Sequence, residues 1–317
     1  MVAVNTFGRA WQALGRYGDH INTVANGLAV SRKPPIFVVG LPRSGTTWVA
    51  SILNTAQSVK YFHEPFNCSN VPGAAKFCMR YLTPEHNDPE FVQRSRDAFA
   101  GRTRVESVRG MLSGVYRPFP WLPGRIVVKG VCCCLAVESI FESVSPRTLI
   151  VIRHPCAVAA SWHRLGYDLD RHIRTLLDQP HLLDSLLKPF GDVLHEAEGF
   201  WQKMGALWGA TYYVLLQQCH NQPDWIVVQH EELCRNAPDR FRRLFDALDL
   251  AWTASTDSLL EVSTKTDSAQ PYLTHRLSEQ EPGKWKNELS DEQAEQVLRF
   301  ARPFAVPFYL NLECELT

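Results

Sequence analysis

The chain has 317 residues, of which 45% are hydrophobic and 21% charged, and its 33 basic side chains equal its 33 acidic ones in number. This composition is typical of a globular protein, and the absence of a basic excess argues against binding to nucleic acid. No apolar run approaches the roughly 18 residues that a membrane-spanning helix needs, so no membrane span is expected.

The first predicted element is an N-terminal helical segment, residues 1–33, whose apolar side chains recur at roughly helical spacing. It lacks the continuous apolar core and the cleavage site of a signal peptide, so we expect it to pack on the domain that follows. Attachment to a membrane surface is the alternative. The nine cysteines are odd in number and have no C-x-x-C pair, which indicates free thiols in a reducing, cytoplasmic compartment.

An anion-binding loop is predicted after the first strand. Residues 36–39 form a short apolar run that predicts a buried strand, and helical spacing follows up to Leu53. The turn between them carries one cation and three hydroxyls in the run Arg43, Ser44, Gly45, Thr46 and Thr47. A strand, a tight turn and a helix together aim backbone N–H groups and the helix dipole at one anion. A strand-to-helix turn with incidental hydroxyls is the alternative.

This loop differs from the usual nucleoside-triphosphate loop. Gly40 and Gly45 have the spacing of the pattern G-x-x-x-x-G-K-[ST], but Thr46 stands where that pattern has its lysine. The positive charge lies inside the loop, on Arg43, whose guanidinium can bind an oxyanion through two N–H groups. We therefore expect an anion site that needs no metal.

A carboxylate and an imidazole follow the second predicted strand. Residues 58–62 predict a short strand that ends at His63 and Glu64. Strand ends beside a phosphate loop are where α/β sheets place their chemistry, so both side chains are candidates for acid–base roles. A surface charge before a proline turn is the other interpretation of Glu64.

Two further strands end in cations. Residues 125–130 carry Lys129 near their end, and a strand that starts at residue 147 ends in Arg153. Because helical patterns separate the strands, we expect a parallel sheet with right-handed crossovers. Lys129 and Arg153 then share the carboxyl edge of the sheet with Arg43, which would suit a multiply anionic ligand.

The rest of the chain predicts more helices, one more strand and a long polar loop. Helical patterns cover residues 135–143, 155–163, 166–219, 238–248 and 291–302, and a strand starts at residue 224. The polar stretch 263–288 is too long for a simple connection, so we expect a functional loop. With no internal repeat, residues 34–317 predict a single three-layer α/β domain, a central parallel sheet with helices on both sides.

Two motifs resemble those of the sulfotransferases that use 3′-phosphoadenosine 5′-phosphosulfate (PAPS). Residues 42–48 are similar to the 5′-phosphosulfate loop of that family. Residues 152–162 are similar to its 3′-phosphate motif, where a strand-end arginine and a serine eight residues later, here Arg153 and Ser161, bind the 3′-phosphate. Residues 230–233 and 282–286 are similar to the family's strand exit and C-terminal Gly-x-Trp loop.

The resemblance implies a P-loop NTPase-like fold, PAPS as donor, 3′-phosphoadenosine 5′-phosphate (PAP) as product and a small-molecule acceptor. The residues it assigns to donor binding are Arg43, Ser44, Gly45, Thr46, Thr47, Trp48, Arg153, Ser161, Arg276, Gly283, Lys284 and Trp285. For Trp48, stacking on the adenine and a place in the core are both open.

The resemblance also bears on the catalytic residues. Cytosolic members carry lysine, a spacer and histidine at the end of the strand that corresponds to residues 125–130, but here Lys129 and its spacer are followed by valine at residue 131. Other branches use a glutamate after the first helix, and Glu64 lies at a comparable position. We therefore expect Glu64 as the general base with His63 second, and Arg43 and Lys129 to neutralise the leaving phosphate.

Other functions remain open at this point. A P-loop kinase is disfavoured because Thr46 replaces the lysine and no Asp-rich metal motif ends a strand. A nucleotide-binding module without activity would bind PAP but transfer nothing. The expected acceptor group is a hydroxyl rather than an amine; natural products, carbohydrates and peptides are all open as acceptors. The oligomeric state is open too, with a homodimer as one option.

Overall fold

The computed structural model describes residues 31–67, 71, 73–103, 124–220, 222–265, 281–307 and 309. The predicted N-terminal segment 1–33 lies almost entirely outside these residues, and so does Arg276. The boundary between this segment and the domain 34–317 therefore stays a prediction.

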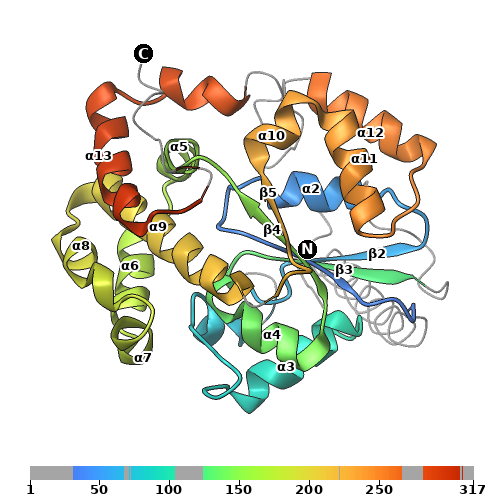
Figure 1. Cartoon of the computed structure of the whole chain (residues 1–317), viewed down its shortest axis with the longest axis horizontal. Helices are drawn as coiled ribbons and strands as arrows, with labels where there is room; N and C mark the ends of the chain where they lie inside the picture. The colour runs from blue at the N-terminus through green and yellow to red at the C-terminus, as the bar shows by residue number, and fades with distance from the viewer. Residues whose placement is uncertain are drawn as a thin grey trace, which may run out of the picture.

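Within the described residues, a five-stranded parallel sheet forms the centre of the fold (Figure 1). Its strands are β1 (Ile36–Val39), β2 (Val59–His63), β3 (Arg125–Gly130), β4 (Arg147–Ile152) and β5 (Ile226–Gln229). They lie in the order β2-β3-β1-β4-β5, and every neighbouring pair is parallel. All four residues of β1 are buried, as expected for a central strand that is covered on both faces.

Helices connect and cover these strands. In the described ranges the α-helices are α2 (Thr46–Leu53), α3 (Pro89–Phe99), α4 (Val137–Val144), α5 (Pro155–Leu165), α6 (Leu169–Leu177), α7 (Pro180–Asp184), α8 (Gly191–Glu196), α9 (Gly199–His220), α10 (His230–Arg235), α11 (Ala237–Ala247), α12 (Ala254–Lys265) and α13 (Asp291–Ala301). Short 3₁₀ turns are η1 (Ala74–Phe77), η2 (Cys134–Ala136), η3 (Lys188–Phe190), η4 (Glu281–Asn287) and η5 (Arg302–Phe304). The irregular region that the sequence predicted after residue 68 contains α3, which Asp88 caps through the N–H groups of Glu90 and Phe91.

Alternating residues of β1 contribute to two separate cores. Phe37 and Val39 belong to a cluster with residues of α3, α4, α5, α9 and α13, whereas Ile36 and Val38 pack with residues of α2, α10, α11 and α12. Successive side chains of a strand point to opposite faces, so the two clusters are the two faces of the sheet. Figure 1 shows the corresponding helix layers. The predicted three-layer α/β fold is confirmed.

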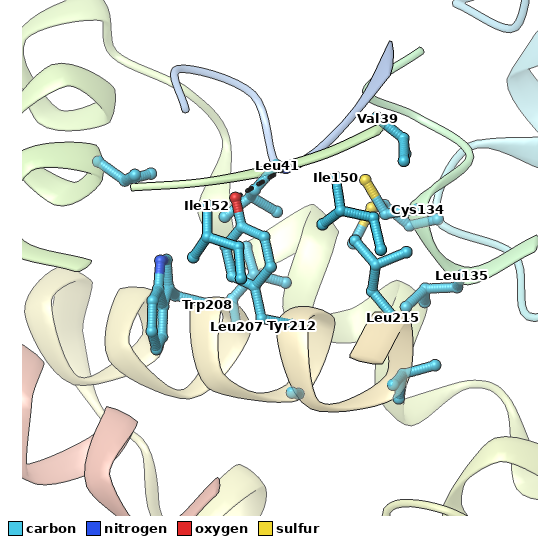
Figure 2. Close-up of a cluster of buried hydrophobic side chains, with 14 of the residues drawn as sticks. Val39, Leu41, Cys134, Leu135, Ile150, Ile152, Leu207, Trp208, Tyr212 and Leu215 are labelled. Carbon is cyan, nitrogen blue, oxygen red and sulfur yellow. Dashed lines mark hydrogen bonds between the residues drawn. The ribbon is translucent and has the colours of Figure 1, made fainter. Parts of the chain in front are cut away.

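Helix α9 is the long helix of one outer layer and lies along the sheet (Figure 2). Leu207, Trp208 and Leu215 of α9 are buried in the same cluster as Ile150 and Ile152 of β4. Its other side packs closely on α13: a Cβ on Gly205 would lie 2.2 Å from the carbonyl oxygen of Val297. Most of the apolar side chains of this helix are expected to be core, and Met204, Leu207, Trp208, Tyr212, Val214 and Leu215 are buried, whereas Phe200 and Trp201 are partly buried.

Candidate active site

The carboxyl ends of the strands bring the predicted charged residues to one edge of the sheet. His63 at the end of β2 is in register with Lys129 of β3, and Val39 at the end of β1 is in register with Gly130 and Ile150. The loop after β1, Glu64 after β2 and Arg153 after β4 therefore leave the sheet on the same side. The prediction that Arg43, Lys129 and Arg153 share this edge is confirmed.

The loop after β1 has a strained but well-fixed backbone. Arg43 and Gly45 have φ angles of 75° and 92°, in the left-handed region that non-glycine residues seldom adopt. Helix α2 begins directly after Gly45, and no side chain caps its first N–H groups. A Cβ on Gly45 would lie 2.2 Å from Cδ2 of His230, so only glycine fits there. The uncapped helix end can bind an anion.

Two aromatic side chains hold this loop from the protein interior. The hydroxyl of Tyr212 on α9 accepts a hydrogen bond from the Leu41 N–H (3.2 Å; Figure 2). The same hydroxyl donates to the carbonyl of Val151 (3.0 Å) and shares a 2.6 Å hydrogen bond with the Ser44 hydroxyl. The Trp162 Nε1–H donates to the carbonyl of Pro42 (2.9 Å). Burial raises the pKa of Tyr212, so its hydroxyl stays protonated.

Ser44 has a different environment from the one expected for a donor-binding hydroxyl. Its side chain is fully buried, and its hydroxyl is hydrogen-bonded to Tyr212 in the interior. Thr46 is also buried, whereas Thr47 is partly exposed. In this structure the Ser44 side chain fixes the loop, and Thr47 is the more accessible of the loop's hydroxyls.

A chain of contacts links the loop to the predicted 3′-phosphate residues. The Arg43 Nε–H donates to Ser161 Oγ (2.9 Å), and Arg153 Nη1 donates to the carbonyl of Arg43 (3.2 Å). Arg153 Nη2 forms an ion pair with Glu281 Oε2 (3.0 Å), and Lys284 Nζ lies 3.3 Å from Glu281 Oε1. The structure thus brings together Arg43, Ser161, Arg153 and Lys284, as the sequence predicted, and adds Glu281.

Glu64 lies in a second cluster at the same edge. Its carboxylate forms an ion pair with Lys129, accepts a hydrogen bond from Asn67 Nδ2 (2.6 Å), and lies 3.7 Å from His63 Nε2. Tyr61 hydrogen-bonds to His63 Nδ1 at 2.8 Å. The backbone of Glu64 has a φ of 51°, in the left-handed region that residues other than glycine seldom adopt.

Both titratable groups of this second cluster have shifted pKa values. Burial alone would raise the pKa of Glu64, but the ammonium of Lys129, together with His63 and the hydrogen bonds, lowers it to about 2. Burial and the charge of Lys129 lower the pKa of His63 to about 4, against a smaller opposing effect of Glu64. At neutral pH the carboxylate is therefore ionised and the imidazole is uncharged.

The two predicted tryptophans are buried. Trp48 is 7% exposed, donates its Nε1–H to Ser263 (3.1 Å) and packs edge-on against Phe241. These contacts favour the core interpretation of Trp48 that the sequence left open. Trp285 is stacked on His154, with ring centroids 4.7 Å apart, while Gly283 is exposed.

Sequence reasoning missed several residues that shape the site. Tyr212 was predicted as one of the core aromatics of its helix, and Trp162 was noticed only as the last residue of the motif 152–162. The polar atoms of neither side chain leave a periodic signal. Glu231 was noticed within residues 230–233 but not given a role; it accepts hydrogen bonds from the His154 N–H (2.9 Å) and the Tyr309 hydroxyl (2.6 Å). Glu281 directly precedes the Gly-x-Trp motif, and its partner could not be read from its position.

The described part of the chain shows neither a grouped set of metal ligands nor a membrane-spanning helix. No three or more histidine, cysteine, aspartate or glutamate side chains in it are grouped so that they could hold a metal ion. None of the helices described has the length and apolar character required to cross a bilayer.

Residues 34–106 match the Sulfotransferase family, in agreement with the resemblance drawn from residues 42–48. The matched part includes the loop and Glu64, but not Lys129, Arg153 or Ser161. This match supports sulfuryl transfer as the general activity. None of the curated protein sequences matches the chain.

Solved sulfotransferase structures are similar at low identity. A sulfotransferase domain from the curacin biosynthetic pathway is 15% identical, with 87% of this chain and 99% of that chain covered and a TM-score of 0.46. Sulfotransferase STF9 from Mycobacterium avium is 16% identical, with 99% and 84% covered and a TM-score of 0.45. Mouse sulfotransferase SULT7A1, complexed with PAP, is 12% identical, with 90% and 89% covered and a TM-score of 0.43.

Proposed function

We propose that the protein transfers a sulfuryl group from PAPS to a hydroxyl, or less readily an amine, of a small-molecule acceptor. The observation that carries this proposal is the contact chain from Arg43 to Ser161 and from Arg153 back to the carbonyl of Arg43. It joins an anion-binding loop to a second cationic site. A ligand with phosphate groups at two separate places matches that arrangement better than a nucleoside triphosphate does.

The polar atoms of the second site fit a phosphate. Arg153 Nε is buried and has no hydrogen-bond partner among the described residues. A buried N–H of a charged group without a partner is costly, so a ligand oxygen there would be favourable. Ser161, whose side chain is almost completely buried, offers a hydroxyl beside the Arg43 guanidinium.

The residues of the loop would hold and polarise the 5′ end of the donor. The N–H groups at the start of α2, the Thr47 hydroxyl and the Arg43 guanidinium supply hydrogen bonds and positive charge for the leaving phosphate. Catalysis is then mainly alignment and charge neutralisation, as in phosphoryl transfer. PAPS supplies the activated sulfuryl group.

Lys129 would couple donor binding to the general base. In the structure described here its ammonium is paired with Glu64, and this contact is what keeps the pKa of the carboxyl low. A Lys129 side chain that turns toward an anion at the loop leaves Glu64 in a buried site, where desolvation raises its pKa. Glu64 then becomes a stronger base for the acceptor hydroxyl proton, with His63 next to it as the second candidate.

Transfer of labelled sulfate tests the proposal. The purified protein is incubated with ³⁵S-labelled PAPS and separate pools of phenols, aliphatic alcohols, sugars, peptides and amines, with and without a chelator. We expect labelled product and an equal amount of PAP, with no effect of the chelator. Transfer of phosphate from ATP to the same pools, lost on chelation, would contradict it.

A Glu64→Gln variant tests the assignment of the base. We expect unchanged PAP binding and a loss of turnover of about 10²-fold or more, the usual contribution of a general base. Nearly full turnover with normal donor binding would show that Glu64 is not the base, and the same experiment on His63→Asn would then decide on the second candidate.

A further inference from the structure

Glu281 lies against Arg153, which the proposed function gives to a phosphate, and against Lys284, which the resemblance assigns to donor binding. Its carboxylate is 3.0 Å from Arg153 Nη2 and 3.3 Å from Lys284 Nζ. The side chains of Arg153 and Glu281 are only 13% and 11% exposed. Because water screens this ion pair less than it screens a surface pair, it is a strong contact that a ligand must compete with.

The geometry of Arg153 shows which of its contacts a bound phosphate would displace. Its Nη1 is bonded to the carbonyl of Arg43, its Nη2 to Glu281, and its buried Nε to no described group. Guanidinium groups bind phosphates through two N–H groups on one edge. The edge that contains the unsatisfied Nε also contains Nη2, the nitrogen that Glu281 holds.

We propose that Glu281 is an internal competitor for the 3′-phosphate of donor and product. Its carboxylate keeps Arg153 and Lys284 paired in the unliganded protein and leaves Nη2 when a 3′-phosphate binds. This inference rests on the proposed function, since it requires a 3′-phosphate at Arg153. A phosphate dianion carries more charge than the carboxylate and can displace it, whereas a 3′-hydroxyl cannot.

Competition of this kind affects the release of product. When the phosphate leaves, the carboxylate of Glu281 returns to Arg153 and replaces the negative charge. Arg153 is therefore never left as a buried cation without a partner. Glu281 therefore weakens the binding of PAP and PAPS, and it also shortens the time that the product PAP stays bound. Loss of the charge would favour donor binding and hinder product release.

Calorimetric titration of wild-type protein and a Glu281→Gln variant with PAP and with adenosine 5′-monophosphate (AMP) tests the inference. Glutamine keeps the size of the side chain and removes its charge. We expect the variant to bind PAP about tenfold more tightly and AMP with unchanged affinity. In turnover, KM for PAPS should fall, and kcat should fall with it if PAP release limits the rate.

A Glu288→Gln variant is the matched control. Glu288 belongs to the same region and pairs with Arg164 at 2.8 Å, but this pair is outside the site and Glu288 is exposed. The control removes the same charge and should leave both affinities unchanged. An equal gain in PAP affinity in both variants would show a long-range charge effect and overturn the inference.

Two further outcomes separate this inference from the proposed function. If wild-type protein prefers PAP to AMP but Glu281→Gln binds PAP equally or more weakly, Glu281 is a structural tether and the inference is wrong while the function stands. If wild-type protein shows no preference for PAP, the proposed function fails, and the inference fails with it.

A crystal structure of the wild-type complex with PAP keeps the inference testable if the variant does not fold. We expect the Glu281 carboxylate to lie beyond the roughly 4 Å range of an ion pair from Arg153 Nη2. A carboxylate still paired with Nη2 in the complex would overturn the inference.

Discussion

Replacing Tyr212 by phenylalanine removes a single hydroxyl from beneath the anion-binding loop. That hydroxyl is bonded to the Leu41 N–H, the Ser44 hydroxyl and the Val151 carbonyl, and Tyr212 is completely buried. The substitution therefore leaves three groups without this partner in the interior, while the phenyl ring keeps its packing. We expect the variant to fold but to be less stable and to bind PAP more weakly, since the loop loses its attachment to α9.

The size of the effect follows from these three contacts. At about 1 kcal/mol for each hydrogen bond, the free energy of unfolding should fall by about 3 kcal/mol. An unfolding entropy of about 2.1 cal/mol/K per residue gives roughly 0.7 kcal/mol/K for 317 residues. The melting temperature should therefore drop by about 4–5 °C, which calorimetry or fluorescence-monitored melting can measure.

The matched control is Tyr213→Phe, one residue along the same helix. Tyr213 is partly exposed, and its ring packs against Phe190 with centroids 4.7 Å apart. We expect little change in melting temperature or PAP affinity. Equal losses in both variants would show that the Tyr212 hydroxyl does not specifically hold the loop. A Tyr212→Phe protein with unchanged stability and unchanged PAP binding would show the same.

Three further predictions concern packing, pH and the loop. Gly205→Ala should cost about 1–3 kcal/mol of stability, because its Cβ would lie 2.2 Å from the Val297 carbonyl oxygen, and PAP affinity should be unchanged; a melting temperature equal to wild type would contradict this close packing. His63 has a folded-state pKa of about 4 against an ordinary 6.5, so the unfolded chain binds its proton first, and stability should rise from pH 4 to 6.5. Thermal melts across that range should be flatter for His63→Asn, and parallel curves would contradict the shift. Gly45→Ala should lose PAP binding by titration, because φ is 92° and the new Cβ would overlap His230; wild-type affinity would show that the loop tolerates the change.

The layout of the fold could be predicted from the sequence because strong apolar runs alternate with helical patterns. The runs 36–39 and 125–130 appear in the structure with the predicted bounds, and the strand predicted from residue 147 to Arg153 ends one residue earlier, at Ile152. Strands buried on both faces leave such apolar stretches in the sequence. The order of the strands in the sheet was not predictable. It depends on pairing between segments far apart in the chain, which leaves no pattern in the local sequence. Helix α3 was expected only as one of two or three short helical patterns within residues 68–117, without bounds, since its surroundings are rich in proline and glycine.

The positions of the cations in the site were predictable because the predicted strands end beside them. Strand ends fix where Arg43, Lys129 and Arg153 lie, so chain order was enough to bring them to one edge of the sheet. Their anionic partners were not predictable, because Glu281 reaches Arg153 across 128 positions in the sequence. Such contacts depend on tertiary packing, which leaves no local pattern.

Nucleotide titration shows whether the donor site binds phosphate groups at two places. PAP and AMP differ only at the 3′ position, so wild-type protein should bind PAP about tenfold or more tightly. Arg153→Met should abolish that preference, while Arg164→Met, which removes an exposed arginine paired with Glu288, should keep it. Equal affinities of wild-type protein for PAP and AMP would contradict a donor site that recognises the 3′-phosphate.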